Sequence, residues 1–227
     1  MGWRDGEAVL VTGGASGLGA AVVDAVRAAG GSAIALDRQA CPGEHVLVDL
    51  ADGRAAERAV AEVAEQGPLG AVVCAAGIDA CGALVDVAAD EWERVVQVNL
   101  LGTAAVVRAA VPHLVSTGGR VVTVASTLGL RAVADATAYC ASKFGVVGFT
   151  RALSAELAGS VGVTLLVPGG MRTAFFDDRD ERYRPGPDAH LNRPEDVAGA
   201  VLFALDQPPG CDVRELLICP STESSWP

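Results

Sequence analysis

Apolar residues follow two alternating patterns along this chain. Short, continuous apolar runs are separated by longer segments in which apolar residues recur at helical spacing. The continuous runs predict strands covered on both faces, and the periodic segments predict amphipathic helices. We expect strands at residues 7–12, 32–38, 44–50, 70–77, 119–126, 162–170 and 213–219, and helices at residues 17–30, 53–67, 90–117, 136–159 and 193–206.

Strands and helices that alternate in this way form a parallel sheet with right-handed crossovers. We therefore predict an α/β fold over residues 1–227, a single doubly wound parallel sheet of Rossmann type with helices on both faces. Residues 39–44 are too few for a crossover helix, so that connection must be abbreviated. The long helix at residues 90–117 should begin with Asp90 as its N-cap, and Glu93 completes a capping-box pattern.

Charge and composition narrow the classes of function. The formal net charge is −11, so we expect neither nucleic acid nor an anionic membrane surface as a partner. No unbroken apolar run approaches the roughly 18 residues that span a bilayer. The first residues, MGWRDGEAVLVTGG, carry charges and pass directly into the first strand. This start is not typical of a secretory signal, and we expect a cytoplasmic protein.

Cysteine and histidine spacing gives no sign of a metal site. No two cysteines form a CxxC pair, and the three histidines lie far apart. Most cysteines stand in apolar surroundings, so we expect buried free thiols in a reducing compartment, with a disulfide or metal site as the alternative. These residues are Cys41, Cys74, Cys81, Cys140, Cys211 and Cys219, with His45, His113 and His190.

A glycine-rich turn joins the first strand to the first helix. In TGGASGLG, Gly13 permits a tight turn, Gly17 lets backbone approach a phosphate, and Gly19 lets helix and strand pack closely. The helix N-terminus offers free N–H groups to a pyrophosphate. No GK[ST] follows, so the turn is not an NTP-hydrolysing P-loop. The pattern favours dinucleotide binding over an ordinary turn.

Asp37 ends the second strand, 18 residues after Gly19. A carboxylate at this position can accept hydrogen bonds from both adenosine ribose hydroxyls, and it would repel a 2′-phosphate. This favours NAD over NADP. The next residue is Arg38, which could instead pair with such a phosphate, so the NADP alternative stays open.

These motifs occur in the order typical of one family. TGxxxGxG, an Asp after the second strand, an Asn within a long helix, a Ser, YxxxK and then PG follow one another from residue 7 to about 219. In this order the chain resembles the short-chain dehydrogenase/reductase family. YxxxK by itself is a weak pattern, but Ser126 thirteen residues before the tyrosine and the glycine-rich turn make the combination specific.

The resemblance implies catalytic roles for four residues. Ser126 corresponds to the serine that orients the substrate, and Tyr139 corresponds to the acid/base. Lys143 matches the lysine that binds the nicotinamide ribose. Asn99 matches the asparagine that holds a proton-relay water, although packing of polar groups inside a helix kink would also explain an Asn within a helix.

The resemblance also implies a set of cofactor contacts. Asp49 and Leu50 match the pair beside the adenine ring, and PGGMRT matches the segment that meets the nicotinamide carboxamide. The full set is Gly13, Ser16, Gly17, Leu18, Gly19, Asp37, Arg38, Asp49, Leu50, Ala75, Ala76, Gly77, Tyr139, Lys143, Pro168, Gly169, Met171 and Thr173.

Two segments depart from the family pattern. The family's NNAG after the fourth strand is CAAG here, which removes two Asn side chains but keeps Gly77. The frequent closing VDGG is replaced by ICPS and a TESSWP tail, which puts the usual C-terminal contacts in doubt.

The spacing of Tyr139 and Lys143 has a chemical reason. Residues four apart share a helix face, and a free phenol with a pKa of about 10 is a poor base near neutrality. We expect the Lys143 ammonium to lower the pKa of Tyr139, and the positive nicotinamide would add to this effect. Tyr139 could then exchange a proton with an alcohol or ketone while hydride moves to or from the cofactor.

The resemblance thus implies an NAD-dependent oxidoreductase acting on a secondary alcohol or ketone. An NADP-linked reductase is one alternative. A non-catalytic dinucleotide sensor or scaffold is another, which the four retained catalytic residues argue against. Residues 174–194 form either a substrate lid or a solvated connector, and Leu128, Val133 and Asp135 are candidates for the other pocket wall. Similar enzymes are often homotetramers or homodimers joined through long helices, here residues 90–117 and 137–158.

Overall fold

The computed structural model describes residues 6–223. Its centre is one seven-stranded parallel sheet in the order β3-β2-β1-β4-β5-β6-β7. This confirms the predicted doubly wound fold. Most of the charged start of the chain, on which the prediction about a secretory signal rests, lies outside the described residues. The strands are β1 (Ala8–Thr12), β2 (Ser32–Asp37), β3 (His45–Leu47), β4 (Leu69–Cys74), β5 (Arg120–Val124), β6 (Gly162–Pro168) and β7 (Glu215–Ile218).

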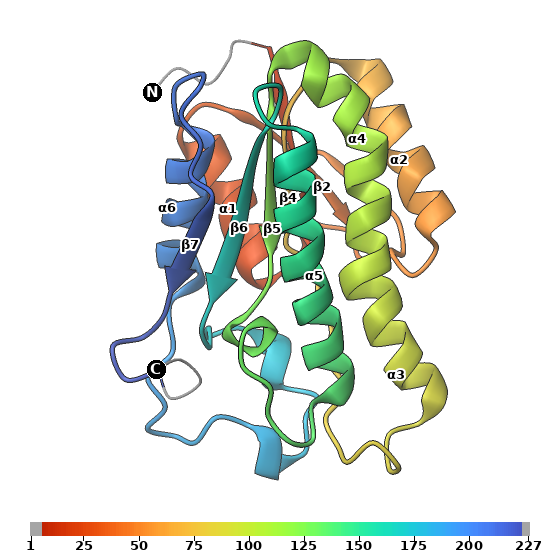
Figure 1. Ribbon diagram of the computed structural model, residues 1–227, viewed down its shortest axis with the longest axis vertical. Helices are drawn as coiled ribbons and strands as arrows, with labels where there is room; N and C mark the ends of the chain where they lie inside the picture. Colours follow the sequence, from red (N-terminus) through yellow and green to blue (C-terminus); the bar gives the residue numbers. More distant parts are fainter. Residues whose placement is uncertain (1–5, 224–227) are drawn as a thin grey trace.

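Helices cover both faces of the sheet (Figure 1). Helices α1 and α6 pack together on one face, and α2, α4 and α5 cover the other. The α-helices are α1 (Gly17–Ala28), α2 (Gly53–Gln66), α3 (Ala89–Val96), α4 (Thr103–Thr117), α5 (Thr137–Glu156) and α6 (Pro194–Leu205). A π-helical segment, η1 (Gln97–Gly102), joins α3 to α4, and the short 3₁₀ turns are η2 (Thr127–Gly129), η3 (Ala174–Phe176) and η4 (Glu181–Tyr183).

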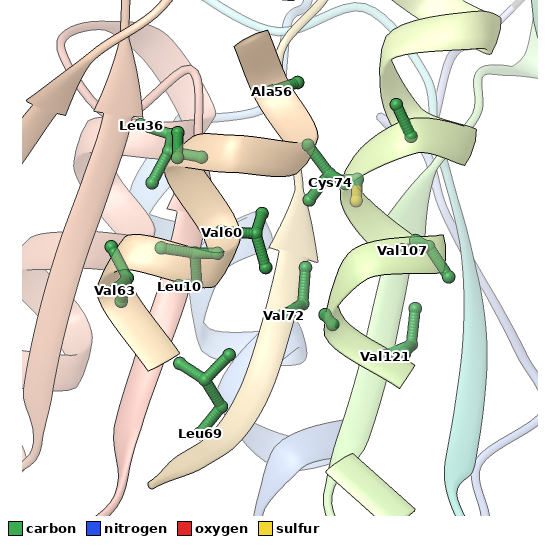
Figure 2. Close-up of a cluster of buried hydrophobic side chains, with 14 of the residues drawn as sticks. Leu10, Leu36, Ala56, Val60, Val63, Leu69, Val72, Cys74, Val107 and Val121 are labelled. Atoms are coloured by element: carbon green, nitrogen blue, oxygen red, sulfur yellow. The ribbon is translucent and has the colours of Figure 1, made fainter. Parts of the chain in front are cut away.

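The strands are apolar on both faces because each face meets a helical layer. In β1, Leu10 belongs to the cluster under α2 and α4, whereas its neighbours Val9 and Val11 belong to the cluster under α1 and α6. Figure 2 shows the first cluster, in which Leu10 and Val72 of the sheet face Val60 of α2. Side chains alternate between faces along a strand, so a continuous apolar run supplies both cores at once.

The order of the strands places a topological switch point at the carboxyl ends of β1 and β4. The chain runs from β1 outward to β2 and β3, and then crosses back to β4 on the other side of β1. In doubly wound sheets, ligands bind at such a switch point. No helix lies between β2 and β3, as the short connection predicted, and Ala35 pairs directly with His45.

The long helical segment differs from its prediction in two respects. Its N-cap is Ala88, so the prediction for Asp90 is wrong. Asp90 instead lies in the first turn, where its negative charge interacts favourably with the positive end of the helix dipole. The helix also passes through the π-helical turn. The span Ala89–Thr117 is long and apolar enough on average to cross a membrane, but half of its most apolar window is buried inside the protein. A core helix has this property.

Candidate active site

The glycine-rich turn lies at the switch point and is closely packed. Gly13 has a φ of +72°, and a Cβ there would lie 2.8 Å from the Cα of Ala76, which follows β4. A Cβ on Gly19 would lie 2.1 Å from the carbonyl oxygen of Gly13. Side chains at these positions are therefore excluded. The Ala76 N–H donates to Thr12 Oγ1 at 3.1 Å, which joins the turns after β1 and β4.

The amino end of α1 offers backbone N–H groups beside this turn. Gly17 has a φ of +53°, and Ser16, the N-cap, makes no side-chain capping hydrogen bond. The first turn of α1 holds no acidic residue, so its positive dipole end is not neutralised from within the helix. A Cβ on Gly17 would lie 3.4 Å from the Thr173 methyl group, so the predicted phosphate turn and the segment after β6 are neighbours.

Asp37 ends β2 beside the same turn. One carboxylate oxygen accepts from the Ala15 N–H at 3.0 Å, and the other accepts from the Gln39 N–H at 2.9 Å. Each oxygen can accept a further hydrogen bond. Arg38 is exposed next to it. The structure therefore places both residues on which the choice between NAD and NADP depends at the end of β2.

Asp49 and Leu50 have different surroundings. Asp49 accepts from Arg94 of α3 at 2.7 Å, and this hydrogen bond holds the pKa of Asp49 below its usual value. Leu50 is a buried core residue, and its backbone oxygen would lie 2.7 Å from a Cβ on Gly102. Arg94 was not among the predicted site residues.

Asn99 is fully buried in the π-helical segment η1. Its Oδ1 accepts from the Ile78 N–H at 2.8 Å, and its Nδ2 donates to the Ile78 carbonyl at 2.9 Å and to Ser142 Oγ at 3.0 Å. The side chain thus ties the segment after β4 to α5. π-Helical turns of this kind are frequent at functional sites. Sequence reasoning missed Ser142, the buried polar partner on α5.

Ser126, Tyr139 and Lys143 lie together, as predicted. The Ser126 hydroxyl accepts from the Leu128 N–H at 3.1 Å and forms a hydrogen bond with Tyr139. Lys143 Nζ lies 5.6 Å from the centroid of the Tyr139 ring and donates to the Val124 carbonyl at 2.8 Å. A Cβ on Gly77 would lie 3.5 Å from the same Nζ, so the segment after β4 borders the lysine.

The pKa of Tyr139 differs from its prediction. Burial raises the pKa of Tyr139 to about 12, and the Ser126 hydrogen bond only partly opposes this effect. The prediction that Lys143 lowers this pKa is therefore wrong for the protein by itself. Burial also lowers the pKa of Lys143 to about 8, because little surrounds the ammonium that would stabilise its charge.

The segment of residues 174–184 covers Tyr139. The Phe175 ring lies 5.7 Å from the Tyr139 ring, centroid to centroid. Arg179 Nη2 donates to Asp79 Oδ2 at 2.6 Å, and the Tyr183 hydroxyl donates to Asp135 Oδ2 at 3.0 Å. These contacts bring the segment onto the two loops beside the tyrosine, as in the lid interpretation.

The residues predicted to form the other pocket wall differ in their contacts with this segment. Val133 is exposed, whereas Asp135 holds the segment and adopts a positive φ of 58°. Asp79 and Arg179 are functional candidates that sequence reasoning missed. Asp79 stands two residues after Gly77 at the carboxyl end of β4, which is the one signal that could have indicated it.

The PGG segment after β6 is held from three sides. The Gly169 N–H donates to the Ile218 carbonyl at 2.8 Å, and Met171 forms an isolated bridge with Asn192. The Gly170 N–H donates to Glu223 Oε2 at 3.1 Å, so the described part of the C-terminal tail contacts this segment. Thr173 Oγ1 accepts from Phe175 N–H at 3.3 Å and caps η3.

The cysteines are all free, but only two of them are buried. Cys74 and Cys140 lie in the core, whereas Cys211 is exposed, so the prediction of burial holds only in part. Within residues 6–223, no group of three or more His, Cys, Asp or Glu side chains could hold a metal ion.

The fold and its switch point are those of a doubly wound α/β protein. The sequence profile described as short chain dehydrogenase matches residues 7–184. The chain therefore belongs to the short-chain dehydrogenase/reductase family, whose enzymes act on CH–OH groups with a nicotinamide cofactor.

Relatives within this family have diverse substrates. The chain is 36% identical to the 2-dehydro-3-deoxy-L-rhamnonate dehydrogenase (NAD(+)) of a Sphingomonas species over 76% of this chain and 75% of that protein. It is 31% identical to (3R)-3-hydroxyacyl-CoA dehydrogenase of Mus musculus, over 88% and 90%. It is also 32% identical to glycine betaine reductase ATRR of Emericella nidulans over 96% of this chain, which spans 19% of that protein.

Solved structures share the fold. The ligand-free aldohexose dehydrogenase of Thermoplasma acidophilum superposes with a TM-score of 0.86 at 21% identity, covering 96% of this chain and 95% of that one. An alcohol dehydrogenase from the archaeon Thermococcus sibiricus, complexed with 5-hydroxy-NADP, gives a TM-score of 0.83 at 23% identity, over 93% and 95%.

Proposed function

We propose that this chain is an NAD-dependent oxidoreductase that transfers hydride between the cofactor and a secondary alcohol or ketone. The observation that carries the proposal is the cluster of Ser126, Tyr139 and Lys143 near the switch point of the sheet. The nicotinamide ring supplies the position that accepts or donates the hydride. The residues of this chain bind the reactants and move the proton.

In the proposed reaction, Tyr139 is the acid/base and Ser126 orients the substrate oxygen. Oxidation of an alcohol moves its hydroxyl proton to Tyr139 Oη as hydride leaves the carbon, and reduction of a ketone reverses both transfers. With a pKa of about 12, Tyr139 alone is a stronger acid than an alcohol but is rarely ionised at neutral pH. A positive charge bound beside it would lower this pKa, and Lys143 and Asn99 keep the surrounding backbone in place.

The residues present fit a dinucleotide. The turn at Gly13 and Gly19 has no space for side chains, and the uncapped amino end of α1 suits a pyrophosphate. Among the described hydrogen bonds, the Lys143 ammonium uses one of its three N–H donors, at Val124, so it can donate to ribose hydroxyls. The Asp37 carboxylate supports NAD rather than NADP, because it would lie close to a 2′-phosphate.

We also propose that the chain forms a cytoplasmic homodimer or homotetramer with one domain per subunit. On the helical layer of α4, α5 and η1, Leu101, Val115 and Phe144 are exposed apolar side chains. No residue lies within 4 Å of a Cβ on Gly148 of α5, which leaves space for a neighbouring helix. Light scattering of the purified protein tests this arrangement.

Two measurements test the proposed function. Titration of NADH and NADPH by fluorescence should show preferential binding of NADH, and a panel of secondary alcohols and ketones should reveal turnover by nicotinamide absorbance. Tyr139→Phe should abolish turnover, because it removes the hydroxyl, and leave NADH binding intact. Cofactor binding without turnover on any panel member would instead indicate a sensor, and preference for NADPH would contradict the role of Asp37.

A further inference from the structure

The guanidinium of Arg179 lies one aromatic ring away from Tyr139. Phe175 packs against the Tyr139 ring at 5.7 Å, and Arg179 Cζ lies 5.0 Å from the centroid of Phe175 and 4.6 Å from that of Phe176. The charges of the Asp79–Arg179 pair act on the pKa of the Tyr139 phenol: the Asp79 carboxylate raises it, and the Arg179 guanidinium lowers it. Arg179 therefore lies close to the proposed acid/base.

Two hydrogen-bond partners hold this guanidinium in place. Nη2 donates to Asp79 Oδ2 at 2.6 Å, and Nη1 donates to the Tyr183 carbonyl at 3.3 Å. The Asp79 carboxylate also accepts from the Ala80 N–H at 2.7 Å and from Cys81 Sγ at 3.1 Å. Asp79 is thus itself fixed, and the planar group of Arg179 is positioned before any substrate arrives.

One donor of this group lacks an acceptor. Arg179 Nε is buried and has no hydrogen-bond partner among the described residues. The faces of the two phenylalanine rings accept N–H groups only weakly. A buried donor without a partner is rare in proteins, and a ligand atom that reached Nε when the segment of residues 174–184 moves would complete it.

The charge around Arg179 indicates which acceptor fits. The side chains of Asp79 and Arg179 are 6% and 18% exposed and form a charge-balanced pair. A carboxylate bound to Nε would lie close to the Asp79 carboxylate in a site that water screens poorly. An uncharged hydroxyl or carbonyl oxygen can accept the same hydrogen bond without this repulsion.

We propose that Arg179 is a specificity-determining residue that donates Nε–H to a second, uncharged oxygen on the substrate. The inference rests on the proposed function. The substrate class is then secondary alcohols and ketones that carry a neighbouring hydroxyl or carbonyl group, such as diols, hydroxy ketones and hydroxy esters.

A matched pair of substrates, butane-2,3-diol and butan-2-ol, tests this inference. In the wild type, kcat/KM should be at least about tenfold higher for the diol, because the analogue that lacks the oxygen leaves the donor unpaired. Arg179→Lys keeps a cation for Asp79 but has no Nε–H, so the ratio of the two kcat/KM values should fall close to one. An unchanged ratio in a folded Arg179→Lys protein would overturn the proposal.

Two further arms separate the remaining outcomes. Asp79→Asn removes the balancing charge and should raise kcat/KM for the anion 3-hydroxybutyrate relative to the diol. A gain in activity toward choline on Arg179→Ala would mean that Arg179 occupies a cation site, which refutes the proposed role. If the chain oxidises no alcohol, the proposed function fails. The role of Arg179 would still be supported if the NADH complex bound the diol more tightly than butan-2-ol and lost this preference in Arg179→Lys, as measured by NADH fluorescence. Equal binding would overturn it.

Discussion

Replacement of Lys143 by methionine should stabilise the protein while it impairs the proposed activity. Lys143 is 4% exposed and makes one described hydrogen bond, to the Val124 carbonyl. Burial lowers its pKa from 10.5 to about 8. This shift corresponds to about 3 kcal/mol of destabilisation when the amine is charged. Loss of the hydrogen bond to Val124 returns about 1 kcal/mol, so Lys143→Met should gain about 2 kcal/mol at neutral pH, which raises Tm by about 4–8 °C.

Lys143 makes the free energy of unfolding of the wild type depend on pH. Between the folded pKa of about 8 and the unfolded pKa of 10.5, the unfolded chain binds more protons at Lys143 than the folded chain. The free energy of unfolding of the wild type should therefore rise with pH across this window. Above pH 10, Tyr139 acts in the opposite direction, because its pKa is raised from 10.0 to about 12. The stabilities of Lys143→Met and the wild type are thus best compared between about pH 8 and 10, where Tyr139 contributes little.

Lys143 is the only lysine in the sequence, so its titration can be observed directly. Protein labelled with ¹³C-lysine should give one side-chain signal that titrates near pH 8, and urea unfolding at several pH values gives the stability difference. That difference between Lys143→Met and the wild type should shrink as pH rises toward 10. A lysine signal that titrates at or above its ordinary pKa, or a variant that is less stable at neutral pH, would refute the reasoning.

Three other predictions concern residues of the proposed active site and cofactor site. Only two tyrosines are present, and the pKa values of both are raised, so phenolate absorbance should appear only at a pH above the ordinary pKa of tyrosine. Addition of NAD⁺ should shift the titration of Tyr139 to lower pH and leave the titration of Tyr183 unchanged. Tyr183→Phe is the control, because it leaves Tyr139 as the one titrating tyrosine. Asp37→Ser should improve NADPH binding at least about tenfold by fluorescence titration, because it removes repulsion of the 2′-phosphate, and unchanged selectivity would contradict NAD preference. Glu223→Ala should raise KM for the cofactor about three- to tenfold by loss of the Gly170 hydrogen bond. Glu223→Gln keeps an acceptor and should behave as the wild type. Equal KM values for both variants would show that this contact is dispensable.

Much of the fold follows from the sequence because buried parallel strands have an unambiguous pattern. Runs such as AVLVT in β1 are apolar at every position, since one helical layer covers Leu10 and the other covers its neighbours. The abbreviated connection before β3 could be predicted because six residues cannot form a crossover. The boundary at Asp90 could not, because the N-cap lies two residues earlier at Ala88, which has no capping side chain that would mark it in the sequence.

The proximity of Ser126, Tyr139 and Lys143 could be predicted from the sequence, but the energetics of the candidate site could not. The four-residue spacing places Tyr139 and Lys143 on one helix face, yet it does not show that Nζ turns to the Val124 carbonyl or that burial outweighs its effect on the phenol. The Asp79–Arg179 pair joins residues 100 positions apart. Local patterns do not indicate such a contact, which depends on how the loop after β4 meets the segment after β6.

The hydrogen bonds of Asn99 have a consequence for how the enzyme is made. The Asn99 amide donates to Ile78 and Ser142, and Lys143 donates to Val124, so the geometry of the candidate site depends on strands and helices synthesised at widely separated times. A nascent chain that has not yet released α5 from the ribosome cannot assemble it. A chain that ends before α5 should therefore lack these contacts.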